Sequence, residues 1–352
     1  MTRTGTVFTV LLSTLVATTL ASPLAAEPPH DDKTEGVLPT DVLVAPQLNI
    51  IHAHDHYPPT EIRKNGEGWA LLEMMVDPKG KPFEVTVEKS SGNKAIDAAA
   101  VQAVEEATYK PGLLNGQPIE SSSKLRIVFE LSDYQPAASP DFVESYKALA
   151  HALEQKDRTA ADALMQKLVV RNLYEDAYFG LATYQYARAW GDDPKQLEGL
   201  ERAIAEHDGG HKISEIQIVP ALQEQLRLQI KLRNYSSAVG TWDRLQKLAL
   251  DPAIAAKIST MMDQIVKLSS DNTEYDVPGS MPYGNWFFPL YKRNFRVGVA
   301  AGHVSDVKLR CGNGFVQFAF DQTTQYRVEP KYGKCTIELD GTPGTKINLT
   351  QF

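Results

Sequence analysis

The clearest pattern of hydrophobic and polar positions lies in two short runs, Trp69–Val76 and Phe83–Lys89. Both runs are rich in β-branched and large apolar residues, and the turn sequence Asp77–Gly80 separates them, so they predict two strands joined by a turn. In the second run apolar residues occupy every other position, which predicts a sheet with one buried face and one face in water. The apolar residues of that run are Phe83, Val85 and Val87.

A helical pattern follows and supplies the cover that this sheet needs. Apolar residues recur at helical spacing in Lys94–Thr108, Asp97 lies near the start, and Tyr109–Gly112 is expected to end the helix. The turn sequence Asn115-Gly116 then leads to a third alternating run, Lys124–Leu131. These elements predict a small α+β unit in β-β-α-β order, with an edge strand whose backbone groups face solvent or a partner.

Short motifs occur in this stretch in one fixed order, and none of them is specific alone. They are Tyr57-Pro58, Gly68, Asp77–Gly80, Ser90-Ser91-Gly92, Asp97-Ala98-Ala99, Tyr109–Pro111, Asn115-Gly116 and Phe129. Taken together, residues 57–131 resemble the TonB C-terminal domain family, over roughly a fifth of the chain.

This resemblance implies binding rather than catalysis. In that family an extended peptide, the box near the N-terminus of outer-membrane receptors, adds to the sheet as a strand, so that main-chain hydrogen bonds give affinity. The alternative is that the Tyr-Pro motif only fixes the entry of the chain and that the protein itself caps the strand. On the matching positions, the peptide-binding residues would be Tyr57, Pro58, Lys124, Arg126, Val128 and Glu130.

Residues 1–26 are typical of a secretory signal peptide. Arg3 precedes a mainly apolar run, Val7–Leu20, and small residues follow it. The run is shorter than the roughly 20 apolar residues that span a bilayer. We therefore expect cleavage near Ala21 or Ala26 and export to the periplasm. If the segment is uncleaved, it would anchor the protein in the inner membrane, where the resemblance to TonB implies coupling to a proton-driven motor.

Residues 27–56 are acidic and contain several prolines, and we expect them to form a flexible tether. His52, His54 and His56 lie at alternate positions near its end, which could place three imidazoles on one face of a strand as zinc or copper ligands. The later histidines are scattered along the chain and form no matching set of ligands. We therefore expect neither a metal site nor a cofactor.

A linker, Ser132–Pro140, precedes a helical region at residues 141–270. Three stretches of it resemble one another, each with two helices around a polar break: Ser145–Ala177 around Lys156-Asp157, Tyr178–Ile213 around Gly191-Asp192-Asp193, and Ile218–Ile254 around Arg233-Asn234. Their spacing resembles that of tetratricopeptide repeats, whose stacked helical pairs commonly bind proteins or peptides. The aromatic residues of this region are interpreted as core, so no binding residue is named there.

A second linker, residues 271–285, contains prolines and glycines, and the pattern of strands then continues to residue 352. This predicts a small all-β module over residues 286–352, either a sandwich or a barrel-like sheet. Both cysteines of the chain lie in it. In an exported protein they are expected to form a disulfide, Cys311–Cys335, because no nearby histidine indicates a catalytic thiol.

The net charge of −8 and the lack of a basic run argue against a nucleic acid partner. No Gly-x-Ser-x-Gly sequence, phosphate loop or carboxylate pair in a motif is present, so an enzyme is not expected. The predicted fold class is a multidomain α+β protein with a TonB-like module, an all-α repeat-like middle and a disulfide-closed β module.

The predicted function is binding of a peptide from an outer-membrane receptor or another envelope protein. Binding through the helical surface and a membrane-anchored energy transducer are the alternatives, and a homodimer is also compatible with the open strand edge.

Overall fold

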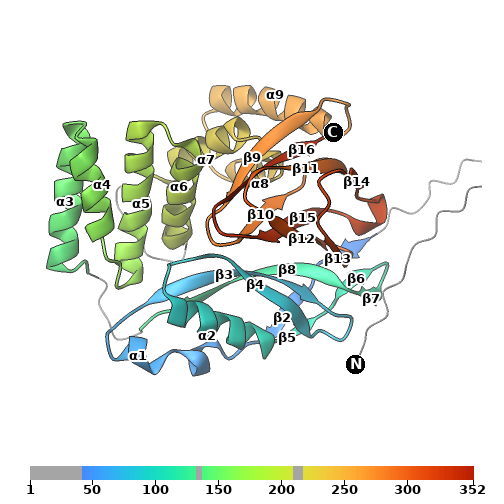
Figure 1. The fold of residues 1–352 in the computed structure, drawn as a ribbon, viewed down its shortest axis with the longest axis horizontal. Helices are drawn as coiled ribbons and strands as arrows, with labels where there is room; N and C mark the ends of the chain where they lie inside the picture. Colours follow the sequence, from blue (N-terminus) through green and yellow to red (C-terminus); the bar gives the residue numbers. More distant parts are fainter. Residues whose placement is uncertain (1–41, 132–136, 209–216) are drawn as a thin grey trace, which may run out of the picture. The chain divides into compact units, whose positions relative to one another are not determined.

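A computed structural model describes residues 42–131, 137–208 and 217–352 (Figure 1). The predicted signal peptide, the first part of the predicted tether and residues 132–136 of the first predicted linker lie outside this range. The described chain contains a mixed part, a helical part and a β part, in the order that the sequence predicts. Among these residues, no helix has both the length and the apolar composition needed to cross a membrane.

The mixed part is built on three antiparallel strands in the order β4-β3-β8. Helix α2 (Lys94–Glu105) covers one face of this sheet (Figure 1), and the Asn93 side chain caps the helix by accepting hydrogen bonds from two N–H groups of its first turn. Apolar side chains of the sheet and the helix form one core, which confirms the predicted β-β-α-β order. The strands are β3 (Gly68–Val76), β4 (Pro82–Ser90) and β8 (Ser121–Phe129).

A β-bulge in β4 decides which of its side chains face α2. Glu84 has a φ of 49°, and the pairing of β3 with β4 shifts by one residue beside it. A shift of one residue sends a side chain to the other face of a sheet. Val85 and Val87 therefore pack toward α2, whereas the Phe83 ring lies against Phe315 of the β part, with ring centroids 6.1 Å apart. The prediction that Phe83 shares a face with the two valines is wrong.

The central part of the second face of the sheet is buried by other parts of the chain, although the alternating pattern predicted that water covers this face. Glu73 in the central strand is only 3% exposed. Trp69 Nε1–H donates to the Asp176 carboxylate of the helical part (2.9 Å), and Arg310 Nη1 of the β part donates to the carbonyl of Glu84 (2.7 Å). This face is polar because it meets polar side chains from both of these parts.

Short strands surround the sheet where the sequence predicted a helix end and loops. Helix α2 ends at Glu105 because Thr108–Lys110 forms β5 instead of the last helical turn. Asn115 and Gly116 have φ values of 51° and 81°, as a two-residue hairpin turn requires, and they join β6 to β7. The added elements are β5 (Thr108–Lys110), β6 (Gly112–Leu114) and β7 (Gln117–Ile119).

The described end of the predicted tether also forms strands, so it is not a flexible segment from Leu43 onward. β1 pairs with β6, and β2 pairs with β5. The physical reason is local, because residues 42–51 contain no charged residue and are rich in β-branched and apolar residues. The elements are β1 (Leu43–Val44), β2 (Gln47–Ile50), the 3-10 helix η1 (Ala53–His56) and α1 (Pro59–Ile62).

The helical part consists of helical hairpins that turn at the three predicted polar breaks. Helix α5 begins at Leu173, so the repeat boundary expected at Tyr178 lies inside a helix. The likeness to tetratricopeptide repeats stays a prediction. The helices are α3 (Pro140–Glu154), α4 (Arg158–Lys167), α5 (Leu173–Trp190), α6 (Asp193–Asp208), α7 (Ile218–Lys231), α8 (Tyr235–Leu245) and α9 (Pro252–Leu268).

The β part is a sandwich of two antiparallel sheets, β10-β15-β12-β13 and β14-β11-β16-β9, around one core. Its first strand begins at Tyr275, inside the stretch predicted to be a linker. Pro278 is tolerated there because β9 is an edge strand, and Val277 and Met281 point into the core. The elements are β9 (Tyr275–Met281), β10 (Asn285–Pro289), β11 (Asn294–Ala301), β12 (Val304–Cys311), β13 (Gly314–Ala319), β14 (Tyr326–Arg327), the 3-10 helix η2 (Pro330–Tyr332), β15 (Cys335–Gly341) and β16 (Thr345–Gln351).

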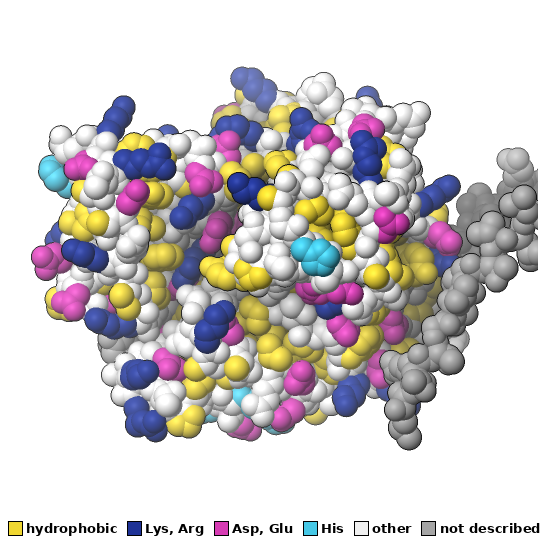
Figure 2. All heavy atoms as spheres, in the orientation of Figure 1, with side chains coloured by type: hydrophobic (Ala, Val, Ile, Leu, Met, Phe, Trp, Pro, Cys, Tyr) yellow, Lys and Arg dark blue, Asp and Glu magenta, His cyan; other side chains and the backbone are white. Residues whose placement is uncertain are grey.

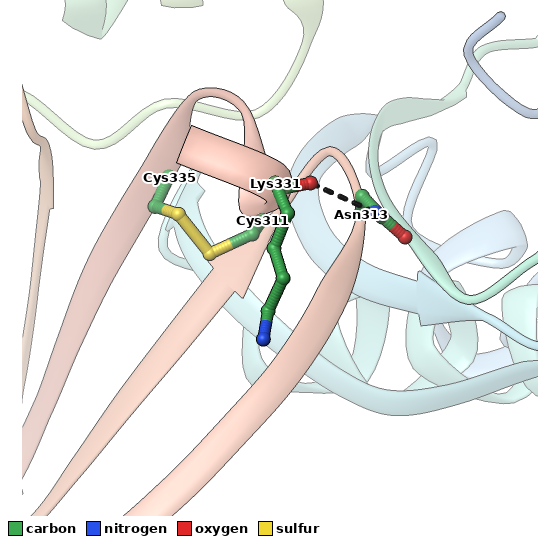
Figure 3. The surroundings of a disulfide bond; sticks show 4 residues. All are labelled: Cys311, Asn313, Lys331 and Cys335. Carbon is green, nitrogen blue, oxygen red and sulfur yellow. Dashed lines mark hydrogen bonds between the residues drawn. A yellow bond between two sulfur atoms is a disulfide. The ribbon is translucent and has the colours of Figure 1, made fainter. Parts of the chain in front are cut away.

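The predicted disulfide is present and joins two neighbouring strands (Figure 3). Cys311 at the end of β12 lies directly opposite Cys335 at the start of β15. Beside it, the Asn313 side-chain amide donates to the carbonyl of Lys331 (2.8 Å), which holds the turn after β12 against η2. The covalent bond and this turn therefore fix the same end of the sandwich.

Replacing both cysteines, Cys311→Ser with Cys335→Ser, is expected to lower the free energy of unfolding by about 3 kcal/mol, because the bond restricts the unfolded chain. Urea unfolding followed by circular dichroism would measure this loss. Reduced wild-type protein should lose a similar amount, and a reductant should not affect the double variant. Equal unfolding midpoints for the double variant and the oxidised wild type would contradict the prediction.

Candidate functional site: the outer edge of strand β8

Basic and acidic side chains are interspersed over the face drawn in Figure 2. A field of one sign therefore does not guide a partner to this face, and recognition depends on local contacts. The feature that stands out locally is β8. Among the described residues, its only paired strand is β3, so no strand pairs with its other edge.

The register of the sheet shows which residues of β8 present their main chain at that outer edge. The Ser91 N–H donates to the carbonyl of Trp69 (2.9 Å), so the main-chain groups of Trp69 point toward β4. Val128 is opposite Trp69 in β8, and its own N–H and C=O therefore point away from β3. Because this direction repeats at every second residue, Lys124 and Arg126 also present their N–H and C=O groups outward.

The side chains of these outward residues lie on the sheet face opposite α2 and are held by local contacts. Lys124 Nζ is 2.8 Å from Glu73 Oε1 and 2.7 Å from Glu88 Oε2. Although burial opposes its charge, the carboxylates of Glu88 and Glu73 raise the pKa of Lys124 above its usual value, while burial raises the pKa of Glu73. Lys124 therefore stays charged and fixed beside the edge at neutral pH.

The other two predicted residues of the strand are Arg126, which is half-buried, and Val128, which is exposed like Lys124. The Arg126 guanidinium lies over the Trp69 ring, 4.6 Å from its centroid, which holds it flat on the sheet. Val128 is an apolar residue that is 39% exposed. Glu130 lies just beyond the end of β8 and is exposed. The structure thus brings Lys124, Arg126 and Val128 together along one edge.

Tyr57 lies inside the domain, beneath the end of β8. It is 4% exposed, its hydroxyl donates to the carbonyl of Gly66 (2.9 Å), and its ring packs edge-on against Phe129 with centroids 5.1 Å apart. Burial raises the pKa of Tyr57 well above its usual value. Pro58 is half-buried and precedes α1. These positions support the alternative that the Tyr-Pro motif fixes the entry of the chain and braces β8.

Of the three histidines, His54 and His56 lie in the short helix η1, and His52 directly precedes it. His56 Nε2 lies 3.3 Å from Glu106 Oε2 at the end of α2. Within the part of the chain that the structure describes, no three His, Cys, Asp or Glu side chains lie close enough together to hold a metal ion. The backbone is a 3-10 turn rather than a strand, so alternate residues do not share one face as the pattern suggested.

Sequence reasoning missed the contacts that fix this sheet from outside the module. Glu67 accepts hydrogen bonds from the N–H groups of Leu131 (3.0 Å) and Leu173 (3.1 Å), so one buried carboxylate joins the end of β8 to the start of α5. The single signal in the sequence is Glu67 itself, a charged residue directly before a buried strand. Its partner in α5 is separated from it by 106 residues and could not be inferred.

Residues 53–131 match the family model of the Gram-negative bacterial TonB protein C-terminal. This match confirms the resemblance that the sequence motifs indicated. The chain is 33% identical to protein tonB2 of Pseudomonas aeruginosa over 90 residues, which are 25% of this chain and 33% of that protein. It is 26% identical to protein TonB of Vibrio cholerae over 99 residues, which are 28% of this chain and 41% of that protein. The chain therefore spans about a third of the length of the curated relatives that it matches.

The TonB-family match ends before α3, so the helical part offers a separate candidate surface. A shallow hollow of about 210 Å³ lies between α7 and α9. Its apolar lining includes Met261, which is 37% exposed. The lining residues are Gln223, Leu226, Arg227, Ile230, Ile258 and Met261.

Proposed function

We propose that this protein is a periplasmic binding protein that takes up an extended peptide as an added strand on the outer edge of β8. The peptide would come from an outer-membrane receptor or another envelope protein. The protein is then a binding protein and not an enzyme. The observation that carries the proposal is the outer edge of β8, with which no strand of the described residues pairs, in a domain that matches the TonB C-terminal family.

Strand addition fits the chemistry of this edge. Outward N–H and C=O groups at alternate residues are the groups that a new strand pairs with, and each such bond contributes about 1 kcal/mol net. Lys124 and Arg126 are already held by neighbouring side chains, so their ordering opposes binding less than it would on a flexible edge. The buried Tyr57 ring supports the same strand from beneath.

Replacing Val128 with proline is expected to weaken peptide binding about tenfold, because the ring removes an outward N–H and blocks close approach to the edge. The N–H of Val128 does not bond to β3, so the sheet should remain folded. Binding would be measured by calorimetry with synthetic peptides that carry N-terminal segments of outer-membrane receptors.

Val128→Thr is the matched control, because it keeps the N–H group and the β-branched shape and should bind as the wild type does. Met261→Glu tests the helical alternative, since it places a charge in the hollow between α7 and α9. If Val128→Pro binds normally while Met261→Glu does not, the helical surface is the binding site. Membrane anchoring and coupling to a motor form the further alternative, which the mass of the mature protein from the envelope would test.

A further inference from the structure

One end of the outer edge of β8 is already occupied by the β part. Glu120 immediately precedes β8 and is an even number of residues from Lys124 and Val128, so its carbonyl points to the same outer side. The N–H of Gly314, the first residue of β13, donates to this carbonyl (2.7 Å). The next N–H, that of Phe315, hydrogen-bonds the Glu120 carboxylate. Two successive amides of the β part thus bind the residue at which the edge begins.

The β part is fixed in this position by contacts with the neighbouring strand as well. The Arg310 side chain is fully buried, and its Nη2 donates to Thr86 Oγ1 of β4 (3.2 Å) while its Nη1 donates to the bulged carbonyl of Glu84 (2.7 Å). The Phe315 ring packs edge-on against Phe83. The turn between β12 and β13 is therefore held at the start of β8 by several independent contacts and is not a loosely placed loop.

We propose that residues 312–314, the β12–β13 turn with the first residue of β13, are an end stop for the peptide that binds β8. This inference rests on the proposed function. A bound strand can pair with the outward groups from Ser122 to Val128, about seven residues or roughly 23 Å of extended chain. At Glu120 the next outward carbonyl is taken by Gly314, so the peptide must end or turn away there. The β part thereby sets the register and the length of the paired segment.

If the turn is an end stop, lengthening the peptide at the end that meets Glu120 should no longer increase its affinity. Synthetic peptides with receptor N-terminal segments would be lengthened residue by residue at each end, and their dissociation constants with the full chain measured by calorimetry. At the end that meets Glu120, affinity should stay within twofold once about seven residues pair, because further residues find no free carbonyl. Tenfold gains that continue past about ten residues at both ends would overturn the stop.

Amide hydrogen exchange on the same complexes separates the two proposals. With saturating peptide, exchange at Lys124 and Val128 should slow at least tenfold, and the Gly314 amide should keep the protection that it has without peptide. If Gly314 loses protection more than tenfold while the β8 amides gain it, the peptide displaces the turn and the end stop is wrong, although strand addition stands. If the β8 amides do not change and Val128→Pro binds normally, strand addition fails and the stop with it.

Discussion

Replacing Glu338 with alanine is expected to lower the free energy of unfolding by about 3–5 kcal/mol, because it leaves a buried guanidinium without a counter-charge. Arg310 Nε donates to Glu338 Oε2 (2.7 Å), and the two side chains are 0% and 1% exposed. Arg310 Nη2 also lies 2.6 Å from Glu338 Oε2, and apart from this carboxylate Arg310 donates to neutral oxygens of β4, at Glu84 and Thr86. These oxygens cannot balance the charge once the carboxylate is gone. Urea unfolding followed by circular dichroism would measure the loss.

Two control variants test whether the loss of stability comes from the buried ion pair. Glu338→Gln keeps an oxygen acceptor for Arg310 and should cost less than alanine. Burial raises the pKa of Glu338, although Arg310 and Lys308 oppose this shift. The site therefore does not strongly favour the charged carboxylate over the neutral side chain. Glu329→Ala removes the partner of Lys331 in an exposed pair and should cost under about 1 kcal/mol. A loss for Glu338→Ala no larger than that for Glu329→Ala would contradict the argument.

The raised pKa values also fix the sign of the pH dependence. Glu73 and Glu338 both have pKa values raised by burial, so in the folded state they bind protons more readily than in the unfolded chain. Their contribution to stability is therefore fully present in acid and is lost as the pH rises through the raised folded values. This is the opposite of a surface carboxylate whose pKa is lowered by an ion pair.

Elements whose determinants are local could be predicted from the sequence. Strands fill residues 286–352 as their pattern predicted, and the helical hairpins turn at the polar breaks, because turn residues and periodicity act within a few positions. Two predictions were wrong although the features that decide them are also local. The Glu84 bulge reverses the direction of Phe83, and the Pro278 and Gly279 pair that suggested a linker lies in an edge strand, where a missing N–H is tolerated.

From the sequence, the domain that contains the candidate site could be predicted, but the details of the site could not. The third alternating run and the motif order pointed to the edge of β8, and Lys124, Arg126 and Val128 present their main chain along it. Peptide binding at this edge stays a prediction. The occupied end of the edge could not be predicted, because Glu120 and Gly314 are far apart in the sequence and meet only through the packing of two sheets. An alternating polar residue in a strand faces either water or another polar surface, and periodicity alone does not distinguish these cases.

The second large expected effect on stability concerns the contact between β3 and the helical part. Asp176 in α5 is fully buried, accepts a hydrogen bond from Trp69 Nε1–H (2.9 Å) and forms an ion pair with Arg202 of α6, whose Nε lies 3.0 Å from Asp176 Oδ2. Arg202 also donates to the carbonyl of Ser91, directly after β4. One carboxylate therefore neutralises a largely buried guanidinium and satisfies an indole N–H at the contact between two parts of the chain.

Asp176→Ala is expected to lower the free energy of unfolding by about 3–5 kcal/mol, because in a buried site Arg202 loses its counter-charge and the Trp69 indole loses its acceptor. Asp176→Asn keeps one oxygen acceptor and should lose less. Asp162→Ala is the matched exposed control, since it removes only an exposed bond with the Tyr186 hydroxyl and should cost under about 1 kcal/mol. Urea unfolding with tryptophan fluorescence and circular dichroism recorded together would measure these losses. If the two signals separate only in Asp176→Ala, the carboxylate couples the sheet to the helices, whereas coincident transitions with a loss equal to that of Asp162→Ala would show that it does not.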